Sequence, residues 1–153
     1  MILSFLSKKL SNNKILLRII AVAAAIGVAD TVYLTADRYF GTGVQCFLLE
    51  GCEIVLKSRY SEIAGIPLAV LGLIFYIGIF VLINAFDIYR NSSLLKILKT
   101  GGVVGFVASV IFLSIQIFVL KAVCIYCLIS FGSSTAIFIA SRTYALEVGS
   151  PLG

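Results

Sequence analysis

Four cysteines are the residues of this chain whose type and spacing suit chemistry. Cys124 and Cys127 form a C-x-x-C motif, and Cys46 and Cys52 are separated by five residues in an earlier segment. Residues three apart on a helix share one face and lie within bonding reach of each other. At the beginning of a helix, unpaired N–H groups and the positive end of the helix dipole lower the pKa of the first thiol. Lys121 adds positive charge nearby, so the motif predicts a redox-active pair.

Other uses of the cysteines are open. The chain has no histidine, which excludes imidazole catalysis and His-ligated metal centres. Four thiolates can bind zinc, although the gap between Cys46 and Cys52 is wider than zinc sites usually have. Two structural disulfides can also staple an outer loop. Two of the cysteines are expected in a loop and the other two at the start of a helix that adjoins it. This arrangement favours a relay of thiol–disulfide exchange.

The cysteines must be positioned by a very apolar chain. Of its 153 residues, 61% are hydrophobic and only 12% are charged, whereas about a quarter of a soluble domain is charged. Residues 63–86, 101–120 and 122–141 contain no charged side chain and are long enough to cross a membrane as helices. Residues 15–35 form a fourth span, with Arg18 and Asp30 near its ends. We predict an all-α integral membrane protein, a single four-helix bundle of residues 1–144, followed by a tail of residues 145–153 that is disordered or left by cloning.

Basic residues are distributed unevenly between the predicted connectors. Eight of the twelve Lys and Arg residues fall in the N-terminal segment, the second connector and the tail, and four fall on the opposite side. The positive-inside rule therefore places both termini in the cytoplasm. All four cysteines then lie on the extracytoplasmic side, where disulfides persist and can be passed to secreted proteins. The dispersed basic residues form no patch for nucleic acid, so membrane lipid is the expected surrounding.

A pocket for an oxidant is expected below the C-x-x-C motif. Cys127 lies one turn deeper than Cys124, where it can meet a lipid-soluble two-electron oxidant, and quinones are the available class. Residues 53–61 suit a short helix that lies as a lid over this pocket. Asp30 is expected to be an end-of-helix charge bonded to Thr31 or to solvent, in preference to a proton relay. Aromatic residues of the spans that can line the slot are Phe75, Tyr76, Phe112, Phe118 and Phe131.

Several motifs are specific in combination. They are the loop pair of cysteines, Ser58, the Gly65-x-Pro67 turn and the late C-x-x-C. Together they resemble the vitamin K epoxide reductase family, and the resemblance extends over about residues 27–134. The resemblance implies a four-helix transmembrane bundle around a quinone, capped by the loop that carries the first cysteine pair. It also implies an enzyme, a thiol oxidoreductase that supports disulfide bond formation with menaquinone, ubiquinone or a related quinone as electron acceptor.

The resemblance further implies a role for each cysteine. Cys46 exchanges with a thioredoxin-like partner on the extracytoplasmic side, Cys52 passes electrons to Cys124, and Cys127 reduces the quinone. Ser58 matches the family's Ser or Thr that organises the cap and active site. Because no thioredoxin-like domain is fused in this sequence, the partner is expected to be a separate protein.

One departure from the family concerns the quinone pocket. Leu68 and Phe131 align with the Asn and Tyr that polarise the substrate oxygens in the animal members, which favours quinone reduction over epoxide reduction. With Tyr76 and Phe112, they are the candidate quinone-binding residues. The alternative function is a non-catalytic four-helix membrane scaffold with structural disulfides.

Overall fold

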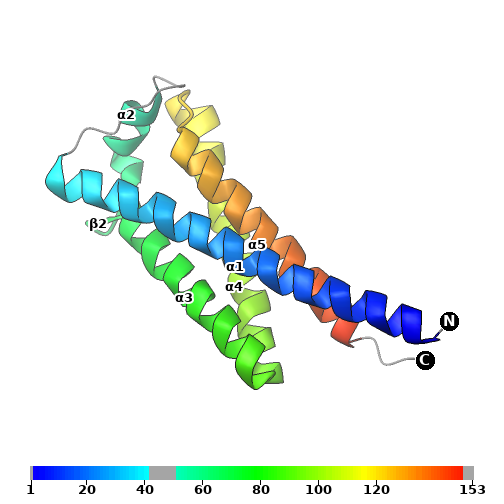
Figure 1. The fold of residues 1–153 in the computed structure, drawn as a ribbon. Coiled ribbons are helices and arrows are strands. Elements are labelled where there is room, and N and C mark those ends of the chain that lie inside the picture. Colours follow the sequence, from blue (N-terminus) through cyan, green and yellow to red (C-terminus); the bar gives the residue numbers. More distant parts are fainter. Residues whose placement is uncertain (1, 42–50, 150–153) are drawn as a thin grey trace.

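The computed structural model of the protein describes residues 2–41 and 51–149, with side chains from residue 12 onward except residues 53 and 149. Nearly all of this part is helical (Figure 1). In chain order the elements are α1 (Ile2–Phe40), α2 (Gly51–Leu56), a 3-10 turn (Arg59–Ser61), β1 (Glu62–Ile63), β2 (Ile66–Pro67), α3 (Leu68–Tyr89), α4 (Ser92–Ile115), a π-helical turn (Gln116–Leu120) and α5 (Ile125–Gly149).

Four of these helical segments are long and apolar enough to cross a membrane. They are Asn12–Phe40, Leu68–Tyr89, Ser92–Leu120 and Ile125–Val148, which confirms the predicted all-α, four-span fold class. Helix α4, which forms the third spanning segment, begins at Ser92. This is nine residues before residue 101, where the predicted third span begins. The first turns of α4 carry Lys96 and Lys99 on the exposed surface, and the side chain of Asn91 caps it by accepting a hydrogen bond from the N–H of Ser93 (2.9 Å). Charged residues interrupt an apolar run without ending a helix, and this accounts for the difference.

Helix α1 crosses the bundle and packs against α3 and α5, while α5 also packs against α4 (Figure 1). Small residues allow close approach in membrane helices. A Cβ at Gly27 of α1 would overlap the ring of Tyr76 on α3. The central buried cluster contains residues from all four long helices, including Ile20, Ala24, Tyr76, Ile79, Ile83, Leu98, Ile137 and Ala140. Large apolar side chains on the outside, such as Ile74, Val81, Ile111 and Ile139, are exposed, as expected of helices solvated by lipid.

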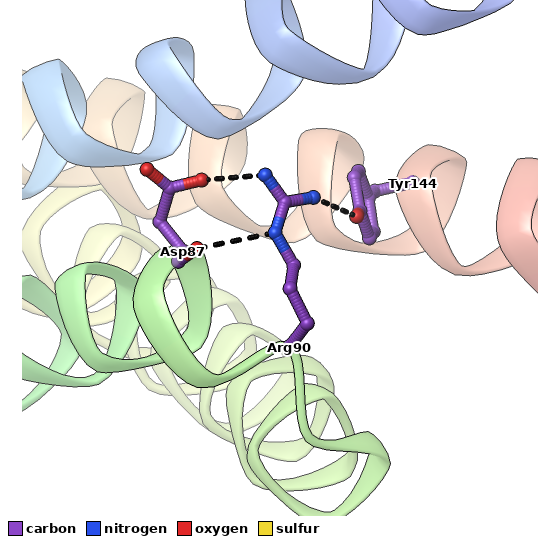
Figure 2. A network of polar contacts seen from close by, with 3 residues as sticks. All are labelled: Asp87, Arg90 and Tyr144. Carbon is purple, nitrogen blue, oxygen red and sulfur yellow. Dashed lines mark hydrogen bonds and ion pairs between the residues drawn. The ribbon is translucent and has the colours of Figure 1, made fainter.

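The connection between α3 and α4 is a tight corner held to α5 (Figure 2). Arg90 adopts a left-handed conformation (φ 50°), and its N–H donates to the carbonyl of Phe86 (2.9 Å). The Arg90 guanidinium donates to the Asp87 carboxylate (2.8 Å) and to the Tyr144 hydroxyl (3.2 Å). These contacts fix the end of α3 against the last turns of α5, at the end of the bundle opposite the cysteines.

The other end of the bundle carries a cap between α1 and α3. Strands β1 and β2 form a minimal antiparallel hairpin in which Ile63 pairs with Ile66. Its two turn residues, Ala64 (φ 53°) and Gly65 (φ 81°), have the positive φ angles of a type I′ turn. An ion pair joins Arg38 of α1 to Glu62 of β1. In the segment where a lid helix was expected over residues 53–61, the structure has the shorter helix α2 followed by the 3-10 turn.

Candidate functional site

The C-x-x-C motif lies at the start of α5. Cys124 directly precedes the helix and is fully buried, Cys127 is half-buried in the first turn, and both are free thiols. Cys124 lies outside the membrane-spanning segments. A hydrogen bond from the Cys127 side chain lowers the pKa of the Cys124 thiol from 9.0 to about 7. Burial opposes this shift, and the backbone N–H groups of Cys127 and Tyr126 support it. The first turn of α5 therefore stabilises a thiolate at Cys124.

A π-helical turn at the end of α4 positions the motif. It begins at Gln116, whose carbonyl accepts hydrogen bonds from the N–H groups of Lys121 and Ala122. The Gln116 side chain, 3% exposed, accepts a hydrogen bond from the N–H of Cys124 (3.1 Å) and also bonds to the Cys127 side chain. Gln116 was not among the site residues predicted from the sequence. The sequence feature that could have indicated its role is a lone amide side chain in an apolar span, eight residues before Cys124.

Cys52 of the cap is adjacent to this motif. It is the second residue of α2, is fully buried and is disulfide-bonded. Cys52 and Cys124 belong to one buried cluster with Val55 and Ala122. Cys46, the other expected loop cysteine, lies outside the described residues. The structure thus brings together one cysteine of the cap and the first cysteine of the C-x-x-C motif.

Gly51 permits this close approach. A Cβ at this position would lie 2.9 Å from both the backbone N and O of Val123, and 3.1 Å from the Cβ of Ala122. Distances below 3.0 Å to backbone atoms leave no room for a methyl group. Helix α2 can therefore lie against the loop before α5 only with glycine at this position, a requirement that sequence reasoning missed.

Ser58 terminates α2 and faces the cavity beneath it. Its hydroxyl donates to the carbonyl of Val55 (2.7 Å), and its own carbonyl accepts from the hydroxyl of Ser61 (2.8 Å). These bonds fix the chain reversal between α2 and the 3-10 turn. The position fits the predicted role of Ser58 in organising the cap.

A cavity of about 860 Å³ lies between the cap and the four long helices. This volume is in the range of small-molecule sites. Cys127 lines the cavity, whereas Cys124 lies behind it in the buried cluster. Among the described residues that line it, apolar ones predominate; they include Leu34, Val55, Leu68, Leu71, Phe75, Val104, Phe112 and Leu113.

The predicted quinone-binding residues divide into two groups. Leu68, Tyr76 and Phe112 line the cavity. Phe131 is absent from the described lining, and its ring instead contacts Phe106 at a centroid distance of 6.2 Å. One residue of helix corresponds to about 100° of rotation, so Phe131 faces away although the preceding residue, a serine, lines the cavity.

Two further aromatic candidates were named from the sequence. Phe75 lines the cavity, and its ring lies edge-on to that of Tyr76 at a centroid distance of 5.1 Å. Phe118 is 78% exposed on the outer surface. Of the two, only Phe75 is among the described residues that line the cavity.

Polar groups of the cavity form a hydrogen-bonded chain. The Tyr76 hydroxyl donates to the Ser130 carbonyl (2.7 Å) and lies 2.8 Å from the hydroxyls of both Ser130 and Ser134. The Ser109 hydroxyl donates to that of Ser134 (3.0 Å). All four side chains line the cavity. The chain joins α3, α4 and α5, so these hydroxyls satisfy one another inside the bundle.

Asp30 also lines the cavity, contrary to the expectation of an end-of-helix charge bonded to Thr31 or solvent. Helix α1 continues for ten residues beyond it to Phe40, and the Asp30 side chain is buried. The hydroxyl of Thr31 is used within its own helix, where it donates to the carbonyl of Gly27 (2.7 Å). The expectation was wrong because α1 extends beyond residue 35, where the predicted span ended, so that Asp30 lies inside the helix.

Comparison with known families confirms the resemblance seen in the motifs. A sequence model described as the vitamin K epoxide reductase family matches residues 18–142. Members of this family in general use quinones and work with thioredoxin-like partners. Because the match runs from the first membrane helix through the cap to the last, the chain belongs to the vitamin K epoxide reductase family of membrane thiol–disulfide oxidoreductases.

Proposed function

We propose that this protein oxidises the dithiol of a separate thioredoxin-like partner and passes the two electrons through two cysteine pairs to a quinone, which supports disulfide bond formation. One observation carries the proposal. Cys52 and Cys124 share a buried cluster at one end of the bundle, while Cys127 lines the adjoining cavity. Cysteines of both pairs therefore lie close to one another at the end of the bundle where the cavity begins, as a relay of electrons requires.

The first exchange takes place at the cap. A thiolate of the partner attacks Cys46 of a Cys46–Cys52 disulfide through a mixed disulfide. The partner leaves oxidised, and both cap cysteines are reduced. Cys52 then attacks Cys124 of the oxidised C-x-x-C pair, and Cys127 leaves as the thiolate. Attack of Cys46 on this second mixed disulfide restores the cap disulfide and leaves Cys124 and Cys127 reduced.

The redox state of the structure corresponds to the end of this sequence. Cys52 is disulfide-bonded, whereas Cys124 and Cys127 are free thiols. The lowered pKa of Cys124 supports its role in exchange, because the thiolate is the nucleophile and a low-pKa thiol is also a good leaving group. A scaffold stapled by two disulfides does not require a free pair at this position.

The cavity fits a quinone ring in size and polarity. Its wall is largely apolar, and the half-buried Cys127 contributes to it. We assign contacts with the ring to Leu68, Tyr76, Phe112 and Phe75. A bound quinone supplies the capacity to accept two electrons and two protons. The cap, held by Ser58, excludes water from the thiols during transfer.

The proposed orientation places the cap and cysteines on the extracytoplasmic side and both termini in the cytoplasm. Figure 1 shows the beginning of α1 and the end of α5 close to each other, away from α2. The α3–α4 corner with Arg90, and the exposed Lys96 and Lys99 that follow it, lie at the end opposite the cysteines. This distribution agrees with the positive-inside rule. Labelling of Cys46 by a membrane-impermeant thiol reagent in reduced intact cells is the expected result, and labelling only after the membrane is breached would overturn the orientation.

Reconstituted turnover tests the function. Purified protein, a reduced thioredoxin-like protein and a soluble quinone analogue are mixed, and quinone consumption is followed optically. Wild-type protein is expected to consume quinone, and Cys127→Ala is expected to stop consumption and accumulate the Cys52–Cys124 mixed disulfide. Ser114→Ala is the control, because this hydroxyl bonds only to the Val110 carbonyl of its own helix in the described structure. An unchanged rate in Cys127→Ala would contradict the relay, and an inactive wild type would favour the scaffold.

A further inference from the structure

Asp30 is a buried acid in the cavity wall whose carboxyl group has no hydrogen-bond partner among the described residues. The side chain is 8% exposed and lines the cavity from α1. Within the described part of the chain, neither carboxyl oxygen has a hydrogen-bond partner. Buried polar atoms are almost always satisfied by protein or by water, so an unsatisfied carboxyl that faces a cavity points to a ligand.

The neighbouring polar groups do not account for Asp30. The hydroxyls of Tyr76, Ser109, Ser130 and Ser134 are bonded to one another or to backbone. Asp30 does not belong to this series of hydrogen-bonded hydroxyls, although it lines the same cavity. Asp30 thus lines the cavity with a buried carboxyl group to which no other described group is hydrogen-bonded.

The cations of the described cavity wall form no hydrogen bond with Asp30. Arg38 pairs with Glu62 of the hairpin, and Lys57 lies in the cap with an interaction of its own. Neither forms a hydrogen bond with Asp30 in the described structure. A carboxylate without a countercharge is strongly disfavoured inside an apolar bundle, so this environment favours an acid that carries its proton.

The groups that surround Asp30 hold transferable protons. Asp30 lies close enough to Cys124, Cys127, Tyr76 and Tyr126 to interact with each electrostatically. Two of these are the thiols that lose their protons when the pair is oxidised, and Cys127 shares the cavity wall with Asp30. The acid thus lines the same cavity as one of the two thiols and interacts electrostatically with both.

We propose that Asp30 is the catalytic acid of quinone reduction, donating its carboxyl proton to a quinone oxygen in the cavity. This inference rests on the proposed function. Oxidation of Cys124 and Cys127 breaks two S–H bonds, forms one S–S bond, and releases two electrons and two protons. Asp30 delivers one proton and regains it from a thiol. The second thiol proton reaches the other oxygen through water or the Tyr76 hydroxyl, so two thiols and a quinone become a disulfide and a quinol.

The test compares Asp30→Asn with Asp87→Asn. Asparagine keeps the size and polarity of aspartate but has no proton to donate. Asp87 is an exposed acid at the opposite end of the bundle, paired with Arg90, and serves as the matched control. General acids contribute at least about 100-fold to the rate. Asp30→Asn is therefore expected to lower quinone consumption about 100-fold, and Asp87→Asn to leave it within about twofold of wild type.

Two further measurements separate proton donation from a structural effect. The rate at which the partner reduces the cap disulfide is expected to be unchanged in Asp30→Asn, since that step involves no quinone. Infrared difference spectra are expected to show the C=O band of a protonated carboxylic acid that shifts when a quinone analogue is added. The band should be present in wild type and Asp87→Asn and absent in Asp30→Asn. Asp30→Glu should restore both band and turnover, and Asp30→Ser replaces Asp30→Asn if the latter does not fold.

Each outcome decides the assignment. If wild type is active and Asp30→Asn consumes quinone at a similar rate, the role of Asp30 is overturned and the proposed function is unaffected. An active wild type without an Asp30-dependent infrared band would do the same. A wild type that consumes no quinone would overturn the proposed function, and the assignment of Asp30 with it.

Discussion

A single methyl group at Gly51 tests the contact between the two cysteine pairs. In Gly51→Ala the new Cβ would lie 2.9 Å from two backbone atoms of Val123. Carbon atoms make favourable contacts at about 3.5–4.0 Å, so helix α2 must move away by roughly 0.5–1 Å. Backbone atoms cannot rotate out of the way as a side chain can, and the displacement therefore carries Cys52 away from Cys124.

The expected effect is kinetic and local. A misplacement of about 1 Å can slow a reaction by about 100-fold, so exchange between Cys52 and Cys124 should fall by about 10- to 100-fold. Overpacking also costs about 1–3 kcal/mol, which should loosen the cap before the membrane helices are affected. The partner's attack on Cys46 depends on a different sulfur and should keep its rate.

The assay uses the Cys127→Ala background, in which Cys124 attacks Cys52 of the cap disulfide and the mixed disulfide accumulates. Acid-quenched samples are digested without reduction, and the cross-linked peptide is quantified by mass spectrometry. Gly78→Ala is the control, because a Cβ there meets nothing within 4 Å. If Gly51→Ala formed the mixed disulfide within twofold of this control, the buried contact would not be the geometry of transfer.

Two other predictions follow from the geometry of the site. The ultraviolet thiolate absorbance of Cys124 should titrate with a midpoint near its pKa of about 7, and exchange should slow as the pH falls below it because the thiol is then protonated. Cys127→Ala removes the main cause of the lowered pKa and should move the midpoint up toward 9.0; an unmoved midpoint would contradict this cause. Gly27→Ala should lower stability by about 1–3 kcal/mol, because the new Cβ overlaps the fully buried Tyr76 ring. Thermal unfolding in detergent checks this against Gly132→Ala, whose Cβ has open space, and equal melting temperatures would refute it.

The four-span fold was predictable because lipid imposes a simple rule on composition. A segment of about 20 apolar residues crosses the bilayer as a helix, and each predicted span overlaps one of the four long helices. The ends of the helices were less predictable. Lys96 and Lys99 lie on the exposed face of α4, where the helix continues in spite of their charge, so a count of uncharged residues begins the third span too late.

The position of the C-x-x-C motif at a helix start was predictable from local sequence, but its surroundings were not. The placement of Cys124 and Cys127 at a helix start depends on a few adjacent residues. The placement of Cys52 in one buried cluster with Cys124 depends instead on glycine at residue 51 and on the π-helical turn that begins at Gln116. Such a turn shifts the helical register, and no periodicity of apolar residues indicates it.

The position of α1 against α5 links the electron donor to the proposed proton donor. Cys127 lies in the first turn of α5, and Asp30 lies on α1, yet both line one cavity. The two helices pack directly against each other, with the buried Ala24 of α1 and Ile137 of α5 in one cluster. Because interiors of this density transmit displacement, a shift of α1 along α5 changes the separation of acid and thiol without altering either residue. We therefore expect the packing of α1 on α5 to set how closely proton transfer is coupled to thiol oxidation.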